Sequence, residues 1–229
     1  MDKRLTRSHL SVNRRQVTNG LVAGGLAAAT VLGAVSPALA QQDVAVDKLM
    51  AASPLPDITI GSKDAKVTIV EYASMSCPHC ANFHKKVMPK LKKKYIETGK
   101  VLMVLREFPL NEIAVAVSML ARCGGDNDKM AALIDVYFEH QDKWLIRGNA
   151  EPKLLELSKQ AGFTKESFQK CLTDEKLYGN LVKQRDIASK QFGVSRTPSF
   201  FINGKALKGD ILRMDTFESV IEPLLKENS

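Results

Sequence analysis

Residues 66–80 of the chain read KVTIVEYASMSCPHC, which places two cysteines directly after an apolar segment. Residues 66–72 are rich in β-branched side chains with stretches of period-two alternation, and this predicts a β-strand. Residues 77–98 predict a helix, because apolar side chains recur every four positions at Phe83, Val87, Leu91 and Tyr95. The cysteine pair is therefore expected to follow a strand and to open a helix.

A second apolar segment, VLMVLR at residues 101–106, completes a β-α-β unit. Its uninterrupted apolar character is typical of a parallel strand that is buried on both faces. We expect Pro89 to kink the intervening helix, because proline removes the hydrogen bond to the carbonyl oxygen of Lys85. Residues 66–111 are thus predicted to be the first half of a fold, with residues 41–65 as a polar, proline-containing lead-in.

The rest of the chain divides into a helical block and a second part with strands. Residues 112–191 show no strand pattern, and we expect five helices there: 112–123, 128–141, one from Pro152 to Gly162, one capped by Thr164, and 174–191. Residues 199–202 (SFFI), Asn203-Gly204 and residues 205–208 predict a β-hairpin, and 214–226 a closing helix. The sequence therefore predicts an α/β chain in which residues 112–191 interrupt the two halves 66–111 and 192–229.

The chemistry is expected at Cys77-Pro78-His79-Cys80. At a helix N-terminus, unpaired backbone N–H groups and the positive end of the helix dipole stabilise an anion, so the pKa of Cys77 should be low. Pro78 suits the first helical position, where a missing N–H costs nothing. His79 adds a donor or a positive charge beside the sulfur. Cys80 lies one turn further, where it can attack a mixed disulfide at Cys77.

Other uses of a C-x-x-C pair have weaker support. A zinc site needs two further ligands at fixed spacing, whereas Cys123 and Cys171 stand alone and His84 lies one turn beyond Cys80. Covalent haem attachment needs a histidine directly after the second cysteine, where this chain has Ala81. A purely structural disulfide would close a very short loop and constrain little of the unfolded chain. We therefore predict no metal and no organic cofactor.

Thr197-Pro198 lies about 120 residues after the cysteines and directly before an apolar strand. Cis peptide bonds are almost confined to X–Pro, and this position suggests a cis bond packed beside the cysteines. Trans is the default for any X–Pro bond, so the residues alone leave both possibilities open.

From about Lys66 onward, the chain resembles the DsbA-like thiol:disulfide oxidoreductases of the thioredoxin superfamily. The resemblance rests on VTIVEY, SCPHCANFH, GKVLMVLREFPL, the helical block and TPSFFINGK, which together cover about 160 residues. It implies a thioredoxin fold with an inserted all-helical subdomain at residues 112–191. It also implies a redox-active Cys77–Cys80 disulfide, with an exposed nucleophilic Cys77, a buried Cys80 and a cis-Pro198 opposite the pair.

Glu71 lies six residues before Cys77, where members of this family often place a buried acid beneath the disulfide. One hypothesis is that Glu71 relays a proton to Cys80 during exchange. The alternative is a strand residue that faces solvent or pairs with Arg106, since the alternation around Glu71 is ambiguous.

Cys123 and Cys171 both lie in predicted helices beside apolar neighbours, so two buried free thiols are one possibility. In an exported protein a structural disulfide between them is favoured, and similar family members carry a cysteine pair at these places. The bond would close a loop of about fifty residues and stabilise the fold. A redox role that tunes the active site is a further hypothesis.

Residues 1–40 have the layout of an export signal. A basic start is followed by an uncharged apolar run at 20–35 and by Ala38-Leu39-Ala40, so we expect cleavage after Ala40. The alternative, a permanent membrane anchor, is disfavoured because Gly, Ala, Ser and Pro dilute the run. Arg14-Arg15 favours the twin-arginine route, although the flanking residues are imperfect. Either route ends outside the cytoplasm, and we expect the periplasm.

Composition limits the remaining possibilities. With 229 residues, 45% hydrophobic and 25% charged, the chain is globular and long enough for one domain with additions. Half of the net charge of +8 belongs to residues 1–40, which carry five Lys or Arg and one Asp. The remainder is only mildly basic, so no nucleic-acid partner is required.

The leading functional hypothesis is an exported, monomeric oxidase that donates its disulfide to unfolded, cysteine-containing exported proteins. The resemblance implies reoxidation by a membrane quinone-linked DsbB-type protein. The second hypothesis is an isomerase or reductase kept reduced, although isomerases of the superfamily dimerise through a separate N-terminal domain and only about 25 residues precede the first strand here. The third is a chaperone-like binding protein that uses the same groove.

Overall fold

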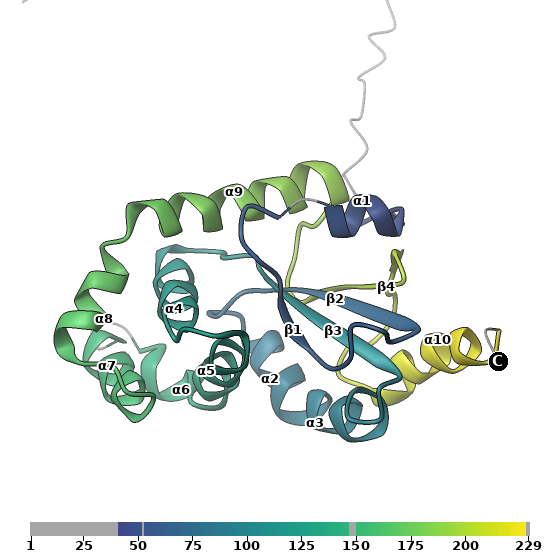
Figure 1. Cartoon of the computed structure of the whole chain (residues 1–229), viewed down its shortest axis with the longest axis horizontal. Coiled ribbons are helices and arrows are strands. Elements are labelled where there is room, and N and C mark those ends of the chain that lie inside the picture. The colour runs from purple at the N-terminus through teal and green to yellow at the C-terminus, as the bar shows by residue number, and fades with distance from the viewer. Residues whose placement is uncertain (1–40, 52, 147–149, 228–229) are drawn as a thin grey trace, which may run out of the picture. The chain divides into compact units, whose positions relative to one another are not determined.

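The computed structural model describes residues 41–51, 53–146 and 150–227, and within them the strands form one five-stranded sheet (Figure 1). The strand order is β1-β3-β2-β4-β5. Strands β2 and β3 pair in parallel, and the other neighbours pair antiparallel. The strands are β1 (Ile58–Ile60), β2 (Val67–Ala73), β3 (Val101–Glu107), β4 (Ser199–Ile202) and β5 (Lys205–Ala206). The expected export signal and its cleavage site lie outside the described residues.

Both faces of the sheet are buried, and alternate residues of β2 separate them. Val67 and Ile69 pack on the face covered by α2 (Pro78–Lys86) and α10 (Met214–Lys226). Val70 and Tyr72 pack on the opposite face, below α1 (Val46–Ala51) and the end of α9 (Glu175–Phe192) (Figure 1). Glu71 therefore points to the α2 face, into a largely apolar core.

The helix that follows the cysteines is broken, as expected from Pro89. Its parts are α2, α3 (Met88–Leu91) and the π-helical turn Lys92–Ile96. The first part ends at Lys86 with Val87 as its C-cap, and Pro89 lies in the first turn of α3, where a proline is tolerated.

The helical block is confirmed as an insertion between β3 and β4. It consists of α4 (Glu112–Arg122), α5 (Asn127–Glu139), α6 (Gln141–Trp144), α7 (Ala150–Gln160), α8 (Lys165–Leu172) and α9. Asn111, Asp126, Thr164 and Asp174 cap four of these helices by accepting hydrogen bonds from backbone N–H groups. The fold is therefore a thioredoxin-type sheet with its helices and an inserted all-helical subdomain.

Three short elements were not predicted. The lead-in at residues 41–65 contains α1 and β1, and β1 pairs antiparallel with β3 through Ile58 and Leu105. Helix α6 has only four residues. Elements of three to six residues are too short to show a periodic pattern, which is why the sequence did not reveal them. No helix in the described part of the chain has the length and apolar character needed to cross a membrane.

Candidate active site

Cys77 occupies the N-cap of α2, where the chain leaves β2 and turns into the helix. Its backbone is extended, with φ of −85° and ψ of 120°, and Pro78 takes the first helical position. The buried side chain of Gln141 fixes this turn, because its Nε2 donates to the carbonyl oxygens of Met75 at 2.7 Å and Cys77 at 3.0 Å. This role of Gln141 was not predicted.

The sulfur of Cys77 lies against the segment that carries Pro198. The Thr197–Pro198 peptide bond is cis, and the Cys77 thiol donates to the carbonyl oxygen of Thr197 at 3.3 Å. The hydroxyl oxygen of Thr197 is buried and has no hydrogen-bond partner among the described residues. It is therefore free to donate to Cys77 when the thiol loses its proton.

The pKa of Cys77 is lowered to about 5. The largest cause is a hydrogen bond from the Cys80 thiol, and burial opposes it. When Cys77 ionises, a hydrogen bond from the Thr197 side chain and bonds from the backbone N–H groups of Cys80 and His79 stabilise the thiolate and lower the pKa further. Cys77 is thus a thiolate at neutral pH, and the helix N-terminus supplies part of the stabilisation.

Cys80 has the opposite character. It is fully buried, and both cysteines are free, so the structure represents the reduced form of the pair. Burial raises the pKa of Cys80 well above its ordinary value, and the hydrogen bond to Cys77 and the charges of Glu71 and Cys77 add to the increase. Two thiols three residues apart therefore hold one proton between them at neutral pH, and that proton stays on Cys80.

The expectation of an exposed Cys77 is wrong, because only 5% of the residue is accessible. The cis segment at Thr197 covers one side of the sulfur. Pro78 and His79, in contrast, are exposed. Beside them is a groove of about 290 Å³, lined by His79, Arg196, Thr197, Pro198, Phe200 and Leu212, among others. Thr197, whose carbonyl oxygen accepts from the Cys77 thiol, is thus both a neighbour of Cys77 and part of this groove's lining.

Glu71 is fully buried, so the interpretation as a solvent-facing residue is wrong. Pairing with Arg106 is also wrong. Arg106 lies opposite Tyr72 in the β2–β3 register, on the other face of the sheet, and it binds Asp57 at 2.6 and 2.8 Å. The partner of Glu71 is His84, whose Nε2 lies 3.0 Å from Oε2.

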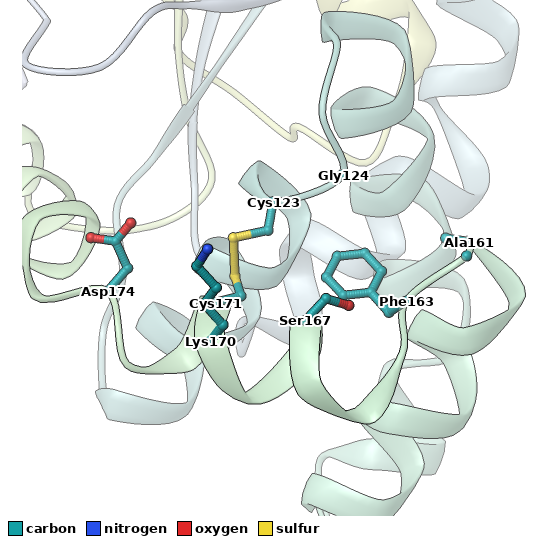
Figure 2. A pocket seen from close by; sticks show the side chains of 9 residues that line it. Cys123, Gly124, Ala161, Phe163, Ser167, Lys170, Cys171 and Asp174 are labelled. Carbon is teal, nitrogen blue, oxygen red and sulfur yellow. A yellow bond between two sulfur atoms is a disulfide. The ribbon is translucent and has the colours of Figure 1, made fainter.

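Cys123 and Cys171 form a disulfide with Cα atoms 6.2 Å apart, so the alternative of two free thiols is wrong. The bond joins the end of α4 to α8 and is distant in sequence from the cysteine pair. Cys171 is buried, whereas Cys123 is exposed. Figure 2 shows the bond at the edge of a surface pocket of about 380 Å³, beside Phe163, Lys170 and Asp174.

The part of the chain that the structure describes contains no group of three or more His, Cys, Asp or Glu side chains that could hold a metal ion.

A cysteine pair that opens a helix against a cis-proline, on a sheet of this topology, defines the thioredoxin class of fold. Residues 54–223 match the family model described as Thioredoxin, and the chain belongs to this family. It is 34% identical over 172 residues to a Rickettsia bellii protein named "Putative protein-disulfide oxidoreductase", which covers 75% of this chain and 66% of the relative. A Rickettsia prowazekii protein with the same description is 35% identical over 148 residues, 65% of this chain and 54% of the relative. The chain thus spans between about half and two thirds of these relatives.

The solved structures that resemble the chain include proteins titled DsbA. The crystal structure of Wolbachia pipientis alpha-DsbA1 superposes with a TM-score of 0.72 at 29% identity and covers 80% of this chain and 97% of that protein. The DsbA-like thioredoxin fold with a helical insertion is therefore confirmed.

Proposed function

We propose that the chain is an exported thiol:disulfide oxidase that donates the Cys77–Cys80 disulfide to exported proteins with free cysteines. The main support for this proposal is the pKa of Cys77, which is lowered to about 5 beside a buried Cys80 that stays protonated. A stabilised thiolate favours the reduced form of the pair, so the Cys77–Cys80 disulfide readily oxidises the thiols of a substrate and is itself reduced. The relatives named protein-disulfide oxidoreductase support this reaction class.

The reaction proceeds in two exchanges. A substrate thiolate in the groove beside Pro198 attacks the sulfur of Cys77, a mixed disulfide forms, and Cys80 leaves as a thiolate that takes up one proton. A second substrate thiolate then attacks the substrate sulfur of the mixed disulfide. The substrate leaves with its own disulfide, and Cys77 remains as the stabilised thiolate.

Each surrounding residue has a role in these steps. Thr197 accepts from the Cys77 thiol through its carbonyl and donates to the thiolate through its hydroxyl. Pro78 and His79 open the helix on the groove side, and Pro198 forms its wall. Glu71, buried near enough to Cys80 for its charge to raise the pKa of that thiol, supplies and removes the Cys80 proton.

The surrounding biology follows from the same proposal. The signal at residues 1–40 directs the chain to the periplasm, where it works as a monomer after cleavage behind Ala40. A membrane quinone-linked protein of the DsbB type restores the Cys77–Cys80 disulfide, because the reduced pair must be recharged after each cycle. The Cys123–Cys171 disulfide is structural.

The test is oxidation of a reduced, unfolded protein such as ribonuclease A by the disulfide form of the mature chain, with Cys77→Ser as the control. Stoichiometric transfer of the disulfide supports the oxidase, and loss of transfer in the control assigns it to Cys77. In cells, acid quenching followed by alkylation of free thiols should show no free cysteine. A pair found reduced in cells points to an isomerase or reductase, and protection of clients by the Cys77→Ser variant points to a chaperone.

A further inference from the structure

His84 is a buried titratable side chain that the two exchanges do not use. It lies on α2, one turn after Cys80, and 7% of the residue is accessible. Its Nε2 lies 3.0 Å from Glu71 Oε2, and its Nδ1 lies 3.1 Å from Asp135 Oδ1 on α5. The side chain of Glu71 is fully buried, whereas that of Asp135 is 47% exposed. The three side chains therefore form a continuous hydrogen-bonded line from the core to the surface.

The ring between two carboxylates favours the charged form of His84. An imidazolium can donate from both nitrogens at once, whereas a neutral imidazole can donate from only one. Burial lowers the pKa of His84, but the charge of Glu71 and the hydrogen bonds to Asp135 and Glu71 outweigh burial and raise the pKa to about 9. His84 is thus a buried cation at neutral pH that holds a transferable proton on the Glu71 side.

Glu71 has one oxygen available for a second transfer. Its Oε2 faces His84, and its Oε1 is buried without a hydrogen-bond partner among the described residues. An unpartnered buried carboxylate oxygen is costly, and such atoms recur at catalytic sites. The charge of Glu71 raises the pKa of Cys80, so this carboxylate acts on the thiol that must gain and lose a proton.

The outer end of the line reaches water. Asp135 and His84 border a groove of about 420 Å³ between α2 and α5. The other charged or titratable residues around His84 are Lys85, Lys92, Glu139 and His140 at this groove and Glu107 at a small cavity on the β3 side. Arg106 also borders this small cavity, but its side chain lies on the other face of the sheet. Arg106 and Glu107 are held in ion pairs with Asp57 and Arg122, respectively. Asp135 and Glu71 are therefore the groups that bond to the ring directly.

We propose that His84 is a positioning residue that stores the proton exchanged at Cys80 and connects Glu71 to water at Asp135. This inference rests on the proposed disulfide exchange. When Cys80 leaves as a thiolate, His84 Nε2 gives its proton to the Glu71 carboxylate, Glu71 passes one proton to Cys80, and the ring regains its proton from water in the groove. When the Cys77–Cys80 disulfide is restored, Cys80 returns its proton to Glu71. The proton then passes through His84 to water in the groove at Asp135.

The experiment measures the rate of exchange with glutathione by stopped flow between pH 5 and 10, together with the thiolate titration of Cys77 by absorbance at 240 nm. The variants are His84→Gln and Asp135→Asn, and His140→Gln is the matched control from the same groove. We expect His84→Gln to slow the step that involves Cys80 by about tenfold or more at pH 7, since general acid–base groups contribute about 10²–10⁴. His84 is not among the causes of the low pKa of Cys77, so the titration midpoint should stay in place.

The Asp135→Asn variant tests the pH–rate profile, which would not shift if His84 had only a structural role. Asp135 raises the pKa of His84, so its loss should move the upper break of the pH–rate profile to lower pH while Glu71 and Cys77 are untouched. His140→Gln should match the wild type. If His84→Gln does not fold, the shift in Asp135→Asn still decides.

Two outcomes would overturn the proposal. One is exchange in His84→Gln and Asp135→Asn with the rates and pH profile of the wild type. The other is a pH-independent slowing in His84→Gln with no shift in Asp135→Asn, which would mean that His84 only fills space. A wild-type protein that does not exchange disulfides at all would contradict the proposed function, and this result is distinct from normal exchange with unaffected variants.

Discussion

The pH dependence of the reduced protein tests the central claim about Cys77. With a pKa of about 5 in the folded protein, Cys77 is a thiolate at pH 7, whereas an unfolded cysteine with a pKa of about 8.5 is still a thiol. A difference of one pH unit corresponds to about 1.4 kcal/mol. Because pH 7 lies about two units above the folded pKa of Cys77, ionisation of this thiol stabilises the reduced folded form by about 3 kcal/mol at pH 7. Because the folded pKa is lowered, this stabilisation is present above pH 8.5 and at neutral pH, and it is lost as the pH falls through 5.

The disulfide form has no titrating thiol at Cys77, which isolates the effect. We expect the free energy of unfolding of the reduced form, relative to that of the disulfide form, to fall by about 3 kcal/mol between pH 7 and pH 4.5. The other titrating groups are common to the two forms and cancel in the difference. The same free energy corresponds to about 60 mV in the reduction potential of the pair at pH 7.

Urea unfolding of both forms at the two pH values measures the difference, and absorbance at 240 nm locates the midpoint directly. Cys77→Ala serves as the control for the absorbance. A midpoint near 8.5, or a difference in stability between the two forms that does not change with pH, would refute the assignment of Cys77 as a stabilised thiolate.

Three further predictions concern other parts of the molecule. Replacing both Cys123 and Cys171 by Ser removes a crosslink between residues 48 apart. In the chain-entropy model this should lower the free energy of unfolding, measured in urea, by about 4 kcal/mol. If the reduction potential of the Cys77–Cys80 pair is unchanged in this variant, the hypothesis that the second disulfide tunes the active site is excluded. Glu71→Gln should slow exchange at Cys80 and change its pH profile, and equal rates across pH would exclude Glu71 as the proton carrier. Asp57→Ala leaves the buried guanidinium of Arg106 without its carboxylate and should cost about 3–5 kcal/mol in thermal or urea unfolding, whereas a loss below about 1 kcal/mol would show that the pair carries little stability.

The sequence predicted the order of the main elements because their patterns are long and distinct. The parallel pair of β2 and β3, the hairpin at β4 and β5 and the break near Pro89 all follow from local chemistry. It did not predict β1 or α6, because three or four residues have no measurable period. The cysteines and the cis segment were predicted to meet, and they do so through Cys77 and Thr197.

The partner of Glu71 could not be predicted, for a physical reason. The residues from Ile69 to Tyr72 are all buried or nearly so, since helices cover both faces of the sheet, and the sequence therefore shows no polar side to indicate direction. The face of Glu71 is set by the register of β2 in the assembled sheet. His84 had a weak signal, because it lies four positions after Cys80 and hence on the same side of the helix.

The contact between Cys77 and Thr197 joins residues 120 apart in the chain, with the whole helical insertion between them. Such long-range contacts carry the largest loop-closure cost and form late in folding. Until β4 has docked beside β2, Cys77 lacks the groups that Thr197 supplies and has a more ordinary thiol reactivity. The Cys77 thiolate therefore gains its full stabilisation only after the segments on both sides of the helical insertion have folded together.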